Sequence, residues 1–238
     1  MEGLNCESRQ SVYFGVNYIT ASRWISDKKK LLDFQNALLE NRLEFSDTKL
    51  GDLNFTLFRK EPSPLLVKVA SLGPQVSNVI INAERPVHSL DLFAKEADVI
   101  CSAYKQTWLD SPCQILRCDA TIRHLYSCAD HAFKYLWENR LEQKPQDFQY
   151  LGRPVSGGGL RLVMPPVKED AEPVQIEIKI ESFLRESGKM FIETLFVWPQ
   201  PRVLQKDTKF DPELRLKRVE KYAISNVCDF VLRPQVEG

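Results

Sequence analysis

The sequence lacks a long apolar run, an excess of either charge and a concentration of cysteine. No window approaches the roughly 18 uninterrupted apolar residues that a membrane-spanning helix needs. The opening, MEGLNCESRQ, lacks the charged start and apolar stretch of a secretion signal. We therefore expect a cytoplasmic protein without membrane association, in which the six scattered cysteines stay reduced.

Neither charge dominates the chain. Lysine plus arginine number 32, and aspartate plus glutamate also number 32. The balance holds locally, because residues 1–110 and 111–238 are each neutral to within one charge. A protein that binds nucleic acid chiefly through phosphates usually carries a basic excess. The charge balance therefore lowers the expectation of a nucleic-acid partner.

No cofactor fingerprint is visible either. The glycine-rich stretch VSGGGLRL at 155–162 runs into the extended segment LRLVMPP, so it lacks the helix N-terminus that cradles a phosphate. We predict a turn or bulge in which the glycines permit positive φ and a close approach of two chain segments. A flexible rim for a ligand is the alternative. We expect no bound cofactor.

What is present is a regular succession of strand and helix patterns. Branched and aromatic residues at 11–19 predict a strand, and a helix follows the capping signal at Ser26. Ser89 begins a second helix. Three extended segments separate the two helices, at 53–60, 63–71 and 75–84.

The same order of elements recurs after Pro112. A strand is predicted at 113–126 and a helix at 128–141. A last helix begins at Asp211, with Pro212 in its first turn, where the missing N–H is harmless. Three extended segments again lie between the helices, at 148–166, 173–184 and 189–199.

These patterns predict an α+β fold. Ile176, Ile178 and Ile180 alternate with polar residues, which indicates a sheet with one wet face. We expect two pseudo-repeats of β-α-β-β-β-α, residues 1–110 and 111–238, within one compact unit. Together they would form a mainly antiparallel sheet with helices on one face.

The order of elements over most of the chain resembles two duplicated folds. One is the saddle of the TATA-box-binding proteins, and the other is the tandem ferredoxin-like repeat of the CRISPR RNA-processing endonucleases. The chain departs from both, because it has neither intercalating phenylalanine pairs flanked by basic strands nor a glycine-rich loop near the C-terminus. The resemblance concerns topology and implies no activity by itself.

The stretch CDATIRHLYSCADH holds the best candidates for chemistry. Cys118, His124, Cys128 and His131 are all zinc-ligand types, but their spacing lacks the paired knuckles of a zinc site. Strand alternation instead places Leu116, Cys118, Ala120, Ile122, His124 and Tyr126 on one core-facing side.

A reactive thiol is a further interpretation of this stretch. Ser127 and Asp130 look like a capping pair, which would put Cys128 in a first helical turn with His131 on the same face. A nucleophilic pair would also need an orienting group and an oxyanion hole. Metal site, reactive thiol and simple packing stay open as alternatives.

The function we expect is that of a non-catalytic protein–protein interaction or scaffold module in a cytoplasmic assembly, and a homodimer is one form that such an interaction could take. The alternative is an RNA-binding or RNA-processing protein that uses the open sheet face. The residues that would then contact nucleic acid are Arg117, Arg123, His124, Arg153, Arg161 and Lys179.

Overall fold

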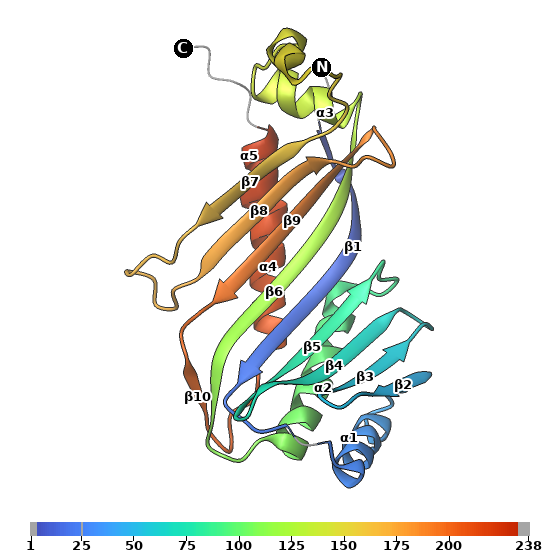
Figure 1. Ribbon diagram of the computed structural model, residues 1–238, viewed down its shortest axis with the longest axis vertical. Coiled ribbons are helices and arrows are strands. Elements are labelled where there is room, and N and C mark those ends of the chain that lie inside the picture. Colours follow the sequence, from blue (N-terminus) through green and yellow to red (C-terminus); the bar gives the residue numbers. More distant parts are fainter. Residues whose placement is uncertain (1–3, 25, 233–238) are drawn as a thin grey trace.

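The molecule is built on one large sheet whose long strands carry helices at one side (Figure 1). The structure is a computed structural model, and it describes residues 4–24 and 26–232. The strands are β1 (Leu4–Thr20), β2 (Asp47–Leu50), β3 (Asn54–Arg59), β4 (Leu65–Gly73), β5 (Val76–Glu84), β6 (Cys113–Cys128), β7 (Gly159–Met164), β8 (Gln175–Ser182), β9 (Lys189–Trp198) and β10 (Arg202–Leu204). The α-helices are α1 (Lys28–Glu40), α2 (Leu90–Trp108), α3 (Ala132–Lys134), α4 (Pro212–Tyr222) and α5 (Cys228–Leu232). The π-helical turns η1 (Tyr135–Arg140) and η3 (Ala223–Val227) continue α3 and α4, and η2 (Pro145–Leu151) is a 3-10 helix.

The sheet is open and antiparallel throughout the described residues. Its strands follow the order β2-β3-β4-β5-β1-β6-β9-β8-β7, and β10 adds a short pairing to β6. The two longest strands, β1 and β6, lie side by side at the centre. The prediction of an α+β protein with a mainly antiparallel sheet is confirmed.

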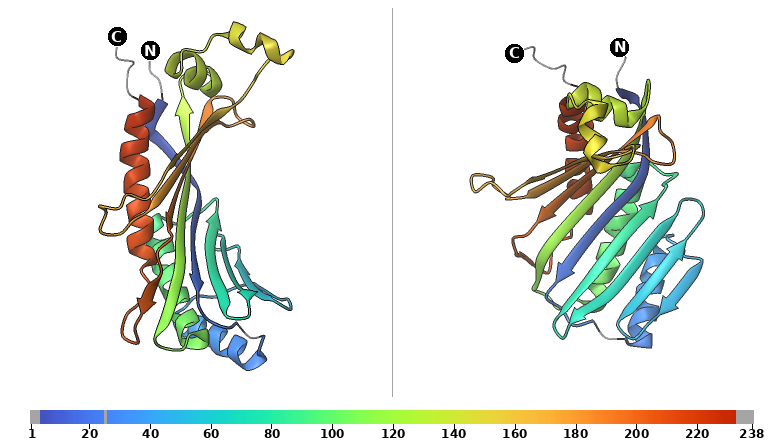
Figure 2. Two further views of the ribbon diagram at one scale, coloured as in Figure 1. Left: turned by 60° about the vertical axis from the view of Figure 1, so that its left-hand side comes forward. Right: turned by 45° about the horizontal axis from the view of Figure 1, so that its top comes forward.

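One face of the sheet is apolar and packs against helices. Phe93 of α2 contacts Phe14 of β1, and Tyr222 of α4 contacts Phe196 of β9, with ring centroids 5.6 and 5.3 Å apart. Phe34 of α1 is buried in the same cluster. Each such side chain contributes about 1.5–3 kcal/mol when fully buried. Both views in Figure 2 place α2 and α4 on the same side of the sheet.

The opposite face of the sheet carries the polar set of each alternating strand. In β8, Ile178 and Ile180 are buried against the helices, whereas Lys179 and Glu181 point the other way and are partly or fully exposed. The alternation at residues 175–181 therefore predicts the orientation of this strand correctly. This polar side is called the open face below.

The beginning of the predicted helix at 128–141 is wrong. Strand β6 runs on to Cys128, whose N–H donates to the carbonyl oxygen of Gly188 at 2.9 Å. The helix begins at Ala132, and His131 is its N-cap, with Nδ1 accepting from the N–H of Phe133 at 3.2 Å. Ser127 and Asp130 are therefore not its capping pair, because cross-strand pairing keeps the chain extended through Ser127 to Cys128.

Two other local predictions also need correction. The expected extended run at 148–166 holds the helix η2 up to Leu151, and β7 begins only at Gly159. Asp27, not Ser26, caps α1, since its carboxylate accepts from the N–H of Lys29 at 2.8 Å. Strand β2 was not predicted, because its four residues are all exposed and show no apolar alternation.

Candidate functional site

The Cys118–His131 stretch does not form a metal centre in the described part of the chain. Cys118 and His124 are buried on the same strand, six residues apart, which corresponds to about 20 Å along the strand. Cys128 and His131 lie at the far end of β6 and just beyond it. Residues 4–24 and 26–232 contain no cluster of three or more histidine, cysteine or acidic side chains suited to a metal ion.

His124 belongs to the core. It points to the covered face, is 1% exposed, and its Nδ1 lies 3.3 Å from the hydroxyl of Ser11. Burial, with the charge of Arg9 adding to it, lowers the pKa of His124 to about 3. The imidazole is therefore neutral at physiological pH. It is also inaccessible to a nucleic acid on the open face.

Cys118 shares that buried face. Burial raises the pKa of its thiol far above the ordinary value. A register shift in the β1–β6 pairing, between Ile19 and Thr20, lets Ile115 rather than Leu116 join the buried set. The predicted core-facing row is therefore right from Cys118 to Tyr126 and is interrupted before it.

Cys128 shows no sign of activation. Burial raises the pKa of its thiol to about 11, and nearby Lys189 only partly opposes this. The residue ends a strand, so it lacks the helix N-terminus that lowers the pKa of reactive thiols. The adjacent His131 uses Nδ1 to cap α3. The arrangement supports packing more than nucleophilic chemistry.

Arg123, Lys179 and Arg161 do come together on the open face. Strand register aligns them in one row with Tyr13 and Glu193, in the order Tyr13, Arg123, Glu193, Lys179, Arg161 across β1, β6, β9, β8 and β7. Two of the directly opposed pairs, Arg123–Glu193 and Glu193–Lys179, carry opposite charges. Each pair of this kind stabilises a sheet by roughly 0.2–1 kcal/mol. We call these five residues and Glu177 the charge ladder.

Hydrogen bonds connect the charge ladder from strand to strand. The Arg123 guanidinium donates to Glu193 and lies over the Tyr13 ring, 4.3 Å from its centroid. Lys179 Nζ donates to Glu193 at 2.6 Å. Arg161 donates twice to Glu177, at 2.8 and 2.9 Å, in the two-point geometry that arginine and carboxylate favour.

The two carboxylates of the charge ladder lie beneath its cations. Glu193 and Glu177 are 5% and 7% exposed, whereas the side chain of Arg161 is 64% exposed. Burial raises the pKa of Glu193, but hydrogen bonds and charge from Lys179 and Arg123 outweigh it, so the net pKa is lowered. The cations are thus accessible but already neutralised from within the sheet.

Arg117 follows the same pattern at the end of β6. Its Nε donates to Asp119 at 2.7 Å, and Asp119 also accepts from Asn17 of β1 at 3.1 Å. Among the described residues, four of the six candidate nucleic-acid contacts therefore carry an acidic partner, namely Arg117, Arg123, Arg161 and Lys179.

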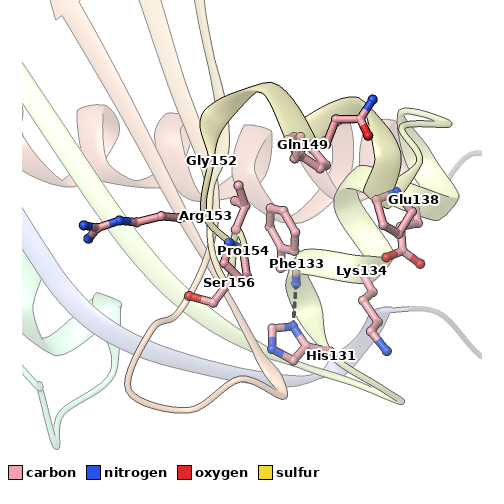
Figure 3. A pocket seen from close by; sticks show the side chains of 12 residues that line it. His131, Phe133, Lys134, Glu138, Gln149, Gly152, Arg153, Pro154 and Ser156 are labelled. Atoms are coloured by element: carbon pink, nitrogen blue, oxygen red, sulfur yellow. Dashed lines mark hydrogen bonds between the residues drawn. The ribbon is translucent and has the colours of Figure 1, made fainter.

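Arg153 and His131 meet at a different place. Both line a cavity of about 660 Å³ between α3 with η1 on one side and η2 with the following loop on the other. Figure 3 shows the Phe133 ring inside it, His131 below and Arg153 extending outward from the rim. The sequence did not predict this cavity, because residues 131–138 and 145–156 are brought together only by the fold.

The sequence analysis does not predict a role for the acidic members of the charge ladder. Glu177 is one of the polar residues that alternate with Ile176 and Ile178, whereas Glu193 lies within the apolar run KMFIETLFVW. A single charged residue on the alternate face of such a strand is the signal that could have identified it. Its partners could not be assigned, since they depend on strand register.

Comparison with models of known protein families gives no match, and comparison with curated proteins gives none either. Among residues 4–24 and 26–232, no helix combines the length and apolar character needed to cross a membrane. Function is therefore inferred from the geometry of the open face and of the cavity.

Proposed function

We propose that this protein is a non-catalytic interaction module that docks a partner protein on its open face within a cytoplasmic assembly. The observation that carries the proposal is the charge ladder, in which exposed cations rest on buried carboxylates. Such a surface presents N–H donors at fixed positions, and its net charge is small. A partner whose carbonyl or carboxylate oxygens have the same spacing as these donors could bind to it.

A nucleic acid would gain less from this face. Phosphate binding draws its affinity from lysine and arginine that release counterions. Here the counterions of Arg123, Arg161 and Lys179 are glutamates of the same sheet, which cannot leave. A phosphate would have to compete with them at 2.6–2.9 Å.

Apolar side chains beside the charge ladder favour a protein partner as well. Phe191 and Leu195 of β9 flank Glu193 on the open face and are partly exposed. Val163, two residues from Arg161 on the edge strand β7, is 52% exposed. Polar groups among partly exposed apolar ones are the usual composition of a non-obligate protein interface.

The test is affinity purification with the tagged chain from the organism that encodes it, with and without nuclease treatment. The open-face variant is Val163→Asp, and the matched control is Leu214→Asp, which places the same change at an exposed position of α4 on the other side of the sheet. We expect a stoichiometric protein that survives nuclease, is lost with Val163→Asp and is kept with Leu214→Asp.

Two results would overturn the proposal. Nuclease could release everything that was captured, which would assign the face to RNA. Alternatively, Leu214→Asp could abolish capture while Val163→Asp retains it, which would move docking to the helical side. If the captured protein is an untagged copy of this chain, the partner is identified as a second copy in a homodimer.

We further propose that residues 1–110 and 111–238 are pseudo-repeats forming a saddle-like sheet. The strand order supports this, because β5 returns to pair with β1 and β9 returns to pair with β6. Each returning strand leads toward a helix on the covered face, α2 or α4. Superposition of β1, β5 and α2 on β6, β9 and α4 in an experimental structure would test the relationship.

A further inference from the structure

The cavity beside α3 has an aromatic floor. Phe133 of α3 and Phe148 of η2 line it, and Trp137 of η1 packs behind them against both rings. Ring centroids are 5.9 Å apart for Phe133 and Phe148, and 5.8 Å apart for Trp137 and Phe148. Pro145, Pro154 and Val155 complete the apolar lining. At about 660 Å³, the cavity lies within the range of small-molecule sites, roughly 300–1,000 Å³.

Helix η2 contacts the aromatic side chains of α3 and η1 through Phe148. No residue of η2 is buried, and Phe148 is the one that joins the aromatic cluster. Because η2 buries no residue, a ligand can occupy the cavity next to it without displacing side chains of the core. The cavity therefore offers apolar contact area that the protein itself leaves unfilled.

The rim of the cavity is polar and carries more positive than negative groups. The cationic side chains are Lys134 and Arg153, Glu138 is the acidic one, and His131 adds an imidazole. Among the residues that the structure describes, neither Lys134 nor Arg153 has a carboxylate within 4.0 Å. This differs from the charge ladder, whose cations are all paired.

His131 adds a donor of defined direction. Its Nδ1 accepts a hydrogen bond from the Phe133 N–H at 3.2 Å, so the proton of the neutral ring is on Nε2. The hydroxyl of Ser156 and the guanidinium of Arg153 belong to the same loop on the facing side. These three residues supply hydrogen-bond donors among the residues that line the cavity.

We infer that this cavity binds a small molecule with an aromatic body and one anionic group, the chemistry of an aromatic carboxylate or sulfonate. The body would lie against Phe133 and Phe148, and the anion would remain at the mouth near Arg153 and Ser156. Figure 3 shows Arg153 at the rim with its side chain extending away from the Phe133 ring, so the guanidinium would have to turn inward to contact that group. The site is independent of the open face and does not require the proposed docking function.

Two dyes of nearly equal shape test separately whether the cavity binds an aromatic body and whether it prefers an anionic group. The probes are 8-anilinonaphthalene-1-sulfonate, which carries one anion, and the neutral N-phenyl-1-naphthylamine. Fluorescence titration of the wild-type chain should show saturable binding of both dyes. Arg153→Gln should weaken the anionic dye by about threefold to fivefold, the size of an exposed ion pair, and leave the neutral dye unchanged.

The cavity itself is tested with Ser156→Trp, which fills it from an exposed rim position. We expect binding of both dyes to be lost. The controls are Arg185→Gln, at an exposed position of the β8–β9 turn, and Ser102→Trp, at an exposed position of α2. Both should bind as the wild type does.

Three outcomes would overturn the inference. Unchanged dye binding in Ser156→Trp would place the dyes elsewhere on the molecule. An equal effect of Arg153→Gln on both dyes would remove the anionic preference. Absence of saturable binding in the wild-type chain would show that the cavity takes neither probe. Circular dichroism of each variant verifies that the fold is retained.

Discussion

At the scale of single residues, His124 makes the most specific prediction about stability. Its pKa is about 3 in the folded chain, held down by burial, against an ordinary value of 6.5. A depressed histidine pKa means that the unfolded state binds the proton more tightly. The stabilising contribution is therefore complete above pH 6.5 and is lost progressively as the pH falls toward 3.

The expected loss is large enough to measure. Between pH 7 and pH 5, the free energy of unfolding should fall by about 2 kcal/mol, which is 1.36 kcal/mol for each pH unit below 6.5. Carboxylates with ordinary pKa values contribute little in that window. Urea unfolding of wild type, His124→Leu and the control His131→Gln would check this. A slope that persists in His124→Leu would contradict the assignment.

Cys128 is expected to be an inert thiol. With burial raising its pKa to about 11, the reactive thiolate is a small fraction of the population at pH 7. Its rate of alkylation by iodoacetamide should therefore rise about tenfold for each pH unit between 7 and 10. Peptide mass spectrometry would follow the residue individually. A rate that levels off near pH 7 would restore the nucleophile hypothesis.

At the scale of elements, the triple glycine explains how β7 joins the sheet. A Cβ on Gly159 would collide with the carbonyl oxygen of Ile180 and with the backbone of Glu181 on β8. Gly157 is crowded by the Leu184 side chain, and neither residue has a positive φ. Positive φ and a close approach of two chain segments were both expected of these glycines. Of Gly157 and Gly159, neither has a positive φ, and both lie close to a neighbouring segment.

Replacement of Gly159 should consequently be costly. We expect Gly159→Ala to lower the free energy of unfolding by about 1–3 kcal/mol, the usual cost of overpacking, because β7 must shift away from β8. Gly73→Ala is the matched control, since a Cβ there meets nothing within 4 Å. Chemical unfolding of the two variants would compare them. Equal stability would mean that the contact at Gly159 relaxes freely.

Elements with strong periodicity could be predicted from the sequence, and those without it could not. Helix α2 begins after Ser89 as expected, because the side chain caps the N–H of Leu92 and an apolar stripe follows. The region from Cys128 to Gly159 could not, since its extended start is imposed by pairing with β1 and β9. The hydrogen bonds of these strand pairs keep Ser127 extended, so its local capping signal does not start a helix.

Site residues divide in the same way. Cys118 and His124 belong to one predicted strand, so the large distance between them can be predicted from the sequence. The pairing of Arg123 with Glu193 depends on the register of β6 against β9. That His131 and Arg153 line the same cavity depends on the path of the chain between α3 and β7. Neither is encoded in local spacing.

At the scale of the whole molecule, composition sets the net charge, and the pairing of side chains sets how charge is distributed over the surface. Equal numbers of basic and acidic residues could have been segregated to different faces. Instead Arg123, Arg161 and Lys179 of the open face are paired with Glu193 and Glu177, whereas Lys134 and Arg153 at the rim of the cavity have no carboxylate partner among the described residues. The two surfaces should therefore differ in the partners they accept.

The proposed docking on the open face is tested most directly by lysine labelling of the isolated complex. Lys179 and Lys68 lie on the open face, whereas Lys28 and Lys221 are exposed on helices of the other side. Acetylation quantified by mass spectrometry should show Lys179 and Lys68 protected in the complex relative to the free chain, and Lys28 and Lys221 unchanged. Protection of Lys28 and Lys221 with free labelling of Lys179 would contradict the proposal.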